Sequence, residues 1–262
     1  MNKNQYVILI DFDKTISIND VGRILLEKFA KPGWKELEKK REKGEMGSKE
    51  CCLRQYPFIK TRKNKILQII LKQEIDPYFK EFIKYINKKS IKLAIVSDGF
   101  DFYINKILKK YNINNIKLYS NIMKYHPDGL KLKFPYENPN CNLCACCKTM
   151  IVNKYLNNNL RVIFIGDSYG DSYAARIADV IFAKNELNKF CKENNINCIQ
   201  YNDFRDILYH FKNKELIYRF NFISNRNCIK LNDWLIISHY HMVNVVKIYM
   251  SSYSDLRRKS RY

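Results

Sequence analysis

The sequence contains no run of 18 consecutive apolar residues, so it offers no segment typical of a membrane-spanning helix. Its first residues lead directly into a predicted strand, and we expect no secretory signal peptide. Nine cysteines without such a signal indicate a reducing compartment, so we expect a cytoplasmic protein with mostly free thiols. These absences favour an intracellular globular protein over a secreted or membrane-spanning one.

Acidic residues are scarce beside basic ones, at 26 against 47, and the formal net charge is +21. A charge of this sign suits nucleic acids and anionic membranes. However, no run of five or more basic residues interleaves with aromatic residues, and lysine is scattered along the whole chain. We therefore expect the charge to attract small anionic substrates. A non-enzymatic nucleic-acid-binding protein remains a remote alternative.

Three short apolar runs predict strands buried on both faces, as in a parallel sheet: Tyr6–Ile10, Lys92–Val96 and Arg161–Ile165. Each run ends in polar residues, namely Asp11 with Asp13, then Ser97 with Asp98 and Gly99, then Asp167 with Asp171. Open α/β sheets bind their ligands at the carboxyl ends of strands. For the first run alone, a capped turn is an alternative, because Asp and Thr favour turns.

About 70 residues, predicted to be largely helical, separate the first two strands. The expected helices are Val21–Phe29, Trp34–Glu42, Ser48–Tyr56, Arg62–Lys72 and one beginning near Pro77. A connection this long predicts a small helical cap that is able to close over the site. We therefore predict a Rossmann-like core over residues 1–16 and 91–211, a helical cap over residues 17–90, and a C-terminal extension of unassigned role over residues 212–262.

Beyond the second strand, predicted helices and strands alternate. The segments are a helix at Phe102–Tyr111, a strand at Ile116–Asn121, a hairpin at Tyr125–Phe134, a helix at Thr149–Leu156, a helix at Asp171–Ala178, a strand at Val180–Ala183, a helix at Glu186–Glu193, a strand at Cys198–Tyr201 and a helix at Asp203–Phe211. This alternation predicts an α/β fold, a parallel sheet with helices on both faces.

Four cysteines lie within seven residues, at positions Cys141, Cys144, Cys146 and Cys147, directly before Lys148. Structural zinc sites usually separate their ligand pairs widely, and this spacing is too compressed for four tetrahedral ligands from one loop. We favour a packed, reduced loop that positions Lys148, with a zinc site as the alternative.

The D-x-D-x-T motif at Asp11–Thr15, the strand-terminal Ser97, the downstream Lys148 and the G-D-x-x-x-D motif at Gly166–Asp171 together resemble the haloacid dehalogenase superfamily. Finer matches resemble the MtnX-like phosphatases of methionine salvage, in the subfamily shared with phosphoserine phosphatase. They lie at Phe29–Trp34, Asp98–Ile104, Cys144–Lys148, Gly166–Leu187 and Tyr201–Phe204. The resemblance implies a Rossmann-like core, a helical cap, Mg²⁺ and phosphomonoester hydrolysis.

The resemblance also implies roles for individual residues. Asp11 would be the nucleophile that forms an aspartyl-phosphate, and Asp13 would be the general acid and then the base. The metal site is expected to comprise Asp11, Asp13 and Asp167 with the carbonyl oxygen of Phe12, and Asp171 to lie behind them or to act as a second acidic ligand. The phosphate-binding residues would be Ser97, Asp98, Gly99 and Lys148.

Two departures from the family pattern bear on the substrate. Lys14 and Asp98 stand where the family often shows glycine, so they bring charges near the phosphate. The expected partner is a small phosphorylated metabolite, with no nucleic acid and no membrane, and a homodimer is left open. The best candidate is 2-hydroxy-3-keto-5-methylthiopentenyl-1-phosphate, and phosphoserine, phosphoethanolamine and pyridoxal phosphate are the alternatives.

Overall fold

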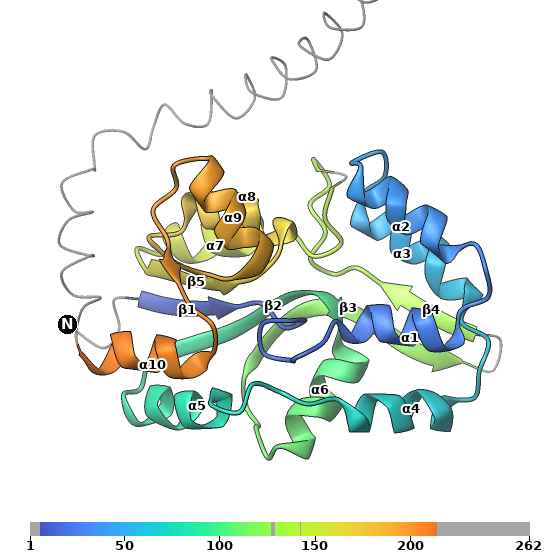
Figure 1. Cartoon of the computed structure of the whole chain (residues 1–262), viewed down its shortest axis with the longest axis horizontal. Helices are drawn as coiled ribbons and strands as arrows, with labels where there is room; N and C mark the ends of the chain where they lie inside the picture. The colour runs from blue at the N-terminus through green and yellow to red at the C-terminus, as the bar shows by residue number, and fades with distance from the viewer. Residues whose placement is uncertain (1–5, 127–128, 142, 214–262) are drawn as a thin grey trace, which may run out of the picture. The chain divides into compact units, whose positions relative to one another are not determined.

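A mixed seven-stranded sheet forms the centre of the computed structural model, which describes residues 6–126, 129–141 and 143–213. Its strand order is β4-β3-β2-β1-β5-β6-β7 (Figure 1). The strands are β1 (Tyr6–Ile10), β2 (Lys92–Phe100), β3 (Lys117–His126), β4 (Gly129–Lys133), β5 (Arg161–Gly166), β6 (Val180–Ala183) and β7 (Ile199–Gln200). Neighbouring strands pair in parallel, except that β3 and β4 form an antiparallel hairpin.

Strand β1 lies between β2 and β5, and every one of its residues is buried. Its last residue, Ile10, is in register with Ile95 of β2 and Ile165 of β5. The apolar runs of the three strands therefore stop at the same level. The polar residues that come next in each chain segment meet at one edge of the sheet. The backbone amide of Asp11 continues the ladder by donating to the carbonyl oxygen of Ile165 at 2.9 Å.

Helices cover both faces of the sheet, so the predicted fold class is confirmed. After β2 the helices are α6 (Asp101–Lys110), α7 (Lys148–Leu156), the 3₁₀ turn η2 (Tyr169–Asp171), α8 (Ser172–Ile177), α9 (Asn185–Glu193) and α10 (Phe204–Lys212). Figure 1 shows α7, α8 and α9 on one face, and α5, α6 and α10 on the other.

The connection from β1 to β2 is helical, as its sequence predicts. It contains α1 (Val21–Phe29), α2 (Trp34–Glu42), α3 (Ser48–Gln55), the 3₁₀ turn η1 (Tyr56–Phe58), α4 (Lys63–Lys72) and α5 (Phe79–Lys88). Helix α1 begins at its N-cap Asp20, whose side chain accepts a hydrogen bond from the amide of Arg23 at 2.9 Å. The last helix of this connection, α5, packs against α10. The ring centroids of Phe79 and Phe204 are 4.8 Å apart.

Strand β2 is longer than its apolar run predicts, because it continues through Ser97, Asp98 and Gly99 to Phe100. Its pairing with β3 shifts register between Val96 and Phe100. A bulge of this kind re-aims backbone groups and side chains at a strand end. The predicted hairpin is confirmed by the pairing of β3 with β4, although residues 127–128 lie outside the described residues.

Most of the predicted C-terminal extension also lies outside the described residues, which end at residue 213. Among the helices of the described ranges, none combines the length and the apolar composition that crossing a bilayer requires.

Candidate active site

Asp11 and Lys148 form a buried ion pair at the end of β1. Lys148 Nζ donates to Asp11 Oδ1 at 2.7 Å and to Asp171 Oδ1 at 2.6 Å. Burial raises the pKa of Asp11, and the charge of Lys148 opposes that rise. Burial alone would lower the pKa of Lys148, but Asp11 and Asp171 raise it well above its usual value. Lys148 therefore stays charged and stabilises the ionised form of Asp11.

Three buried aspartates, Asp11, Asp167 and Asp171, bring carboxylate oxygens within 4.8 Å of one another. Thr15 Oγ1 donates to Asp167 Oδ1 at 3.2 Å, whereas Asp167 Oδ2 is buried without a hydrogen-bond partner in the described residues. Burial and the neighbouring Asp171 raise the pKa of Asp167 to about 6. An unpartnered carboxylate oxygen among three acidic groups suits a cation with a preference for oxygen ligands.

Asp171 is fixed by its own loop. Its Oδ2 accepts hydrogen bonds from the backbone amides of Asp167 and Ser168, each at 3.1 Å, and from the Ser168 hydroxyl at 3.2 Å. A side chain at Gly166 would have its Cβ 2.6 Å from that same oxygen, so only glycine leaves the carboxylate room. The G-D-x-x-x-D spacing thus folds both acidic groups onto one strand end.

Asp13 lies two residues after Asp11 but has different neighbours. Its Oδ1 accepts from the backbone amide of Val21 at 2.8 Å, and its Oδ2 accepts from the Tyr103 hydroxyl at 2.6 Å. Burial, followed by the charge of Asp20, raises the pKa of Asp13 to about 7. The group can therefore exchange a proton near neutral pH. Tyr103 lies within the Asp98–Ile104 stretch that resembles the family, but the resemblance implies no role for it.

Three of the predicted phosphate-binding residues, Ser97, Asp98 and Gly99, lie on the bulge of β2, and the fourth, Lys148, begins α7. The Gly99 amide donates to Ser97 Oγ at 3.0 Å. Asp98 does not direct its carboxylate freely into the site, because its Oδ1 accepts from the amide of Cys146 at 2.6 Å. Burial raises the pKa of Asp98. The extra charge at this position thus serves to attach β2 to the cysteine loop.

The cysteine loop leads directly into α7 and so positions Lys148. Cys147 is the N-cap residue of α7, and Cys146 Sγ donates to the carbonyl oxygen of Tyr119 at 3.7 Å. A hydrogen bond from Cys144 lowers the pKa of Cys147 to about 6. Within the described ranges, no cysteine belongs to a group that brings three candidate metal-ligand atoms together as the aspartates do.

The expected role of the Phe12 carbonyl oxygen in metal binding is not supported. That oxygen accepts from the backbone amides of Thr15, Ile16 and Ser17 at 3.2, 2.9 and 2.9 Å, and from the Ser17 hydroxyl at 3.1 Å. The chain turns back on itself after Asp13, and the turn occupies this carbonyl oxygen.

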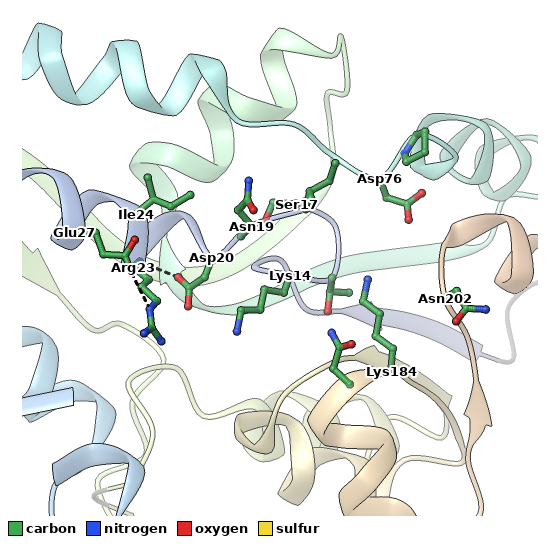
Figure 2. A pocket seen from close by; sticks show the side chains of 14 residues that line it. Lys14, Ser17, Asn19, Asp20, Arg23, Ile24, Glu27, Asp76, Lys184 and Asn202 are labelled. Atoms are coloured by element: carbon green, nitrogen blue, oxygen red, sulfur yellow. Dashed lines mark hydrogen bonds and ion pairs between the residues drawn. The ribbon is translucent and has the colours of Figure 1, made fainter. Parts of the chain in front are cut away.

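A polar pocket of about 490 Å³ is lined by the turn that follows Asp13, by the first residues of α1 and by Lys184 (Figure 2). Its lining includes basic, acidic and amide side chains, namely Lys14, Arg23, Lys184, Asp20, Glu27, Asp76, Asn19, Asn185 and Asn202. Thr15 connects the pocket to the site through its hydrogen bond to Asp167. The charges of Lys14 and Lys184 counteract the rise in the pKa of Asp167. The pocket therefore offers a polar, partly cationic environment beside the buried carboxylates.

The fold and this site together define the class of protein. A parallel sheet whose central strand is followed by Asp11 and Asp13, with Lys148 and Asp167 at the same edge, is the arrangement that the resemblance to haloacid dehalogenase-type phosphatases implies. Within this class the chain belongs to the family described as Putative Phosphatase, whose model matches residues 6–203. The family that the motifs resemble is thereby confirmed.

Individual relatives agree with this placement. The chain is 32% identical over 204 residues to the 2-hydroxy-3-keto-5-methylthiopentenyl-1-phosphate phosphatase of Bacillus cereus, covering 76% of this chain and 93% of that protein. It is 29% identical over 205 residues to the bifunctional enzyme MtnB/MtnX of Bacillus licheniformis, covering 77% of this chain and 48% of that enzyme. A phosphoserine phosphatase structure with a phospho-aspartyl intermediate analogue matches with a TM-score of 0.61 at 21% identity, over 79% of this chain and 99% of that one. At that identity the structural match shows the fold alone.

Proposed function

We propose that this phosphatase hydrolyses a small phosphomonoester through an aspartyl-phosphate on Asp11, with the help of Mg²⁺. The observation that carries the proposal is the pair of hydrogen bonds by which Lys148 Nζ joins Asp11 and Asp171, at 2.7 and 2.6 Å. A carboxylate is a weak nucleophile, and a fixed cation beside it favours its ionised form and orients it.

The residues support a reaction in two steps. In the first, an Asp11 carboxylate oxygen bonds to phosphorus while the bond from phosphorus to the alcohol oxygen breaks, and Asp13 gives that oxygen a proton. In the second, Asp13 takes a proton from water, the water oxygen bonds to phosphorus, and the bond to Asp11 breaks. A pKa of about 7 suits Asp13 to both duties near neutral pH.

The cluster of Asp11, Asp167 and Asp171 fits Mg²⁺, which prefers oxygen ligands. The carboxylates of Asp11 and Asp167 would hold it, the latter with the oxygen that lacks a hydrogen-bond partner. Asp13 was expected to be a third ligand, but both of its carboxylate oxygens already accept hydrogen bonds, from Val21 and Tyr103. Bound there, Mg²⁺ supplies positive charge that offsets the repulsion between the phosphate and the aspartates.

The phosphate oxygens would be bound by Ser97, by the amides of Asp98 and Gly99, and by Lys148. Ser97 and Lys148 are 1% and 4% exposed, so their interactions with phosphate oxygens would be little screened by water. The Gly99 amide, which donates to Ser97 Oγ here, would exchange that acceptor for a phosphate oxygen.

For the substrate, the Bacillus relatives make the enol-phosphate 2-hydroxy-3-keto-5-methylthiopentenyl-1-phosphate the first candidate. The pocket of about 490 Å³ suits a small metabolite. Phosphoserine, phosphoethanolamine and pyridoxal phosphate are the alternatives. To identify the substrate, kcat/KM is measured for a panel of these four compounds, with the enol-phosphate generated in situ. A preference of about a hundredfold for another compound, about 2.7 kcal/mol, would reject the salvage substrate and leave the phosphatase intact.

The reaction itself is tested with the full chain and p-nitrophenyl phosphate, with Mg²⁺ or with EDTA. We expect Mg²⁺-dependent hydrolysis that Asp11→Asn abolishes while the circular dichroism spectrum is unchanged. Asp206→Asn on α10 is the matched control and should retain full activity. Hydrolysis retained by Asp11→Asn would contradict the proposal.

A further inference from the structure

Both carboxylate oxygens of Asp13 are held by groups to which the proposed reaction gives no role. The Val21 amide, at the start of α1, donates to Oδ1, and the Tyr103 hydroxyl, on the first turn of α6, donates to Oδ2. The hydrogen bond from Tyr103 measures 2.6 Å, short for a donor and acceptor that are both oxygens. Tyr103 is 1% exposed, so water does not compete for the contact.

Gly99 leaves the space in which this contact forms. A Cβ at position 99 would overlap the Tyr103 hydroxyl and lie 2.7 Å from Asp13 Oδ2. Any larger residue would push the hydroxyl and the carboxylate apart. The glycine on the bulge of β2 therefore has a second use besides its amide, because it lets Tyr103 reach Asp13.

The Tyr103 ring is packed so that its hydroxyl has little freedom. Its centroid lies 6.2 Å from that of Phe12, the residue before Asp13, and 6.5 Å from that of Phe100. These three aromatic residues are buried to 1% exposure or less. A side chain locked by packing can hold a catalytic group at little entropic cost when the substrate binds.

The two partners of Asp13 differ in one chemical respect. A backbone amide can only donate, so Oδ1 cannot carry the acidic proton while it accepts from Val21. A hydroxyl can donate to a carboxylate or accept from a carboxylic acid. Tyr103 can therefore stay bonded to Oδ2 whether or not that oxygen carries the proton.

We propose that Tyr103 is a positioning residue for Asp13: it holds Oδ2 as the atom that delivers the proton to the leaving oxygen. The proposal rests on the proposed function. Tyr103 acts through Asp13 and not on the phosphate. Its loss should therefore slow the first step, the transfer of phosphate to Asp11, only for substrates whose leaving group needs a proton.

The test compares Tyr103→Phe with Tyr85→Phe on two substrates. Tyr85 also donates one hydrogen bond from its hydroxyl, to the carbonyl oxygen of Phe211 at 3.1 Å, and it lies on α5. The substrates are p-nitrophenyl phosphate, which releases a stable anion, and the best aliphatic monophosphate of the panel, whose alkoxide must be protonated. We expect Tyr103→Phe to lower the first-turnover rate of alcohol release from the aliphatic compound by about tenfold or more, and to change the first-turnover rate of p-nitrophenolate release by less than about threefold.

Tyr85→Phe should leave both rates unchanged. Equal losses on both substrates, or no loss on either, would overturn the role of Tyr103. The proposed function is judged separately, by whether the wild-type chain hydrolyses either compound and Asp11→Asn does not.

A double-mutant comparison separates positioning from a general structural effect. In an Asp13→Asn background, Tyr103→Phe should change the aliphatic rate by less than about twofold, because the residue acts through the group already removed. An undiminished loss would contradict the proposal. If Tyr103→Phe does not fold, Tyr103→Met, which also removes the hydroxyl, replaces it, and equal losses of the first-turnover rate on both substrates would then be the contradicting result.

Discussion

The two aspartates that follow β1 start from the same strand end and reach opposite kinds of environment. Asp11 lies on a charged side, where it is bound by Lys148 and lies near Asp167 and Asp171. Asp13 lies on what we call the uncharged side, because both of its hydrogen-bond donors, the Val21 amide and the Tyr103 hydroxyl, are neutral, although the charge of Asp20 also acts on it. One short motif thus supplies two carboxyl groups, and their surroundings distinguish the two.

This difference matches the work that each group would do. A nucleophile must be ionised, and a buried cation stabilises that form of Asp11. An acid that later becomes a base must gain and lose a proton. Burial and the charge of Asp20 raise the pKa of Asp13 to about 7, although its two hydrogen-bond donors oppose the rise. Pairs of carboxyl groups with separated environments are a general route to acid–base catalysis at neutral pH.

The largest expected effect comes from removing the cation of the charged side. Lys148→Met leaves Asp11 and Asp171 buried without their partner, which should lower the free energy of unfolding by about 3–5 kcal/mol and kcat by at least about a hundredfold. Chemical denaturation and steady-state kinetics measure the two. The control is Lys49→Met, which removes an exposed ion pair with Glu137 and should cost about 1 kcal/mol or less. Equal effects of the two variants would refute a special role for Lys148.

Replacing the proton donor Asp13 should impair proton transfer and leave the hydrogen bonds between Lys148 and Asp11 intact. Asp13→Asn should lower kcat for an aliphatic monophosphate by about 10²–10⁴-fold, because the alkoxide then leaves without a proton. Release of p-nitrophenolate in the first turnover should be far less affected. If both leaving groups slowed to the same extent, Asp13 would not be the acid.

The pKa of Asp13 predicts a dependence of stability on pH. The folded state holds this proton up to about pH 7, whereas the ordinary value is 3.8, so the folded state binds more protons between these limits. Stability from this group is therefore present below about pH 4 and is lost as the pH rises through about 7. In EDTA, Asp13→Asn should raise the melting temperature relative to the wild-type chain more at pH 8 than at pH 4.5. A difference independent of pH would contradict the raised pKa.

The smallest expected effect lies at the turn that follows Asp13. Lys14 has φ 57°, in the left-handed region that favours glycine. Lys14→Gly should raise the free energy of unfolding by about 1 kcal/mol relative to Lys14→Ala, because both variants lose the charge and only glycine relieves the strain. Denaturant titration of the two variants measures it. Equal stabilities would show that the turn is unstrained.

The sequence predicts the charged side better than the uncharged side. The buried strand runs bring Asp11, Ser97 and Asp167 to one edge, because parallel strands end together. The order of the motifs was enough to single out Lys148, which the structure brings to Asp11. Tyr103 lies within the Asp98–Ile104 stretch that resembles the family, but its contact with Asp13 crosses 90 positions of the chain, so the stretch does not reveal its partner.

Two expectations depended on local geometry that the sequence does not specify. The carbonyl oxygen of Phe12 is turned into a tight bend, which a strand-end motif alone does not reveal. Asp98 was expected to place its charge near the phosphate, but the bulge of β2 directs its carboxylate to the amide of Cys146. Whether such polar groups face the site depends on a bulge and a turn, and neither is encoded by periodicity.

The division of labour between Asp11 and Asp13 is tested most directly by rapid mixing of the Asp13→Asn variant with p-nitrophenyl phosphate and Mg²⁺. The first step needs no acid with this leaving group, whereas the second step lacks its base. We therefore predict a burst of about one p-nitrophenolate per active site, a slow steady state, and phosphate bound covalently to Asp11 in the quenched protein. Linear release at the wild-type rate, or phosphate on any other residue, would contradict the account.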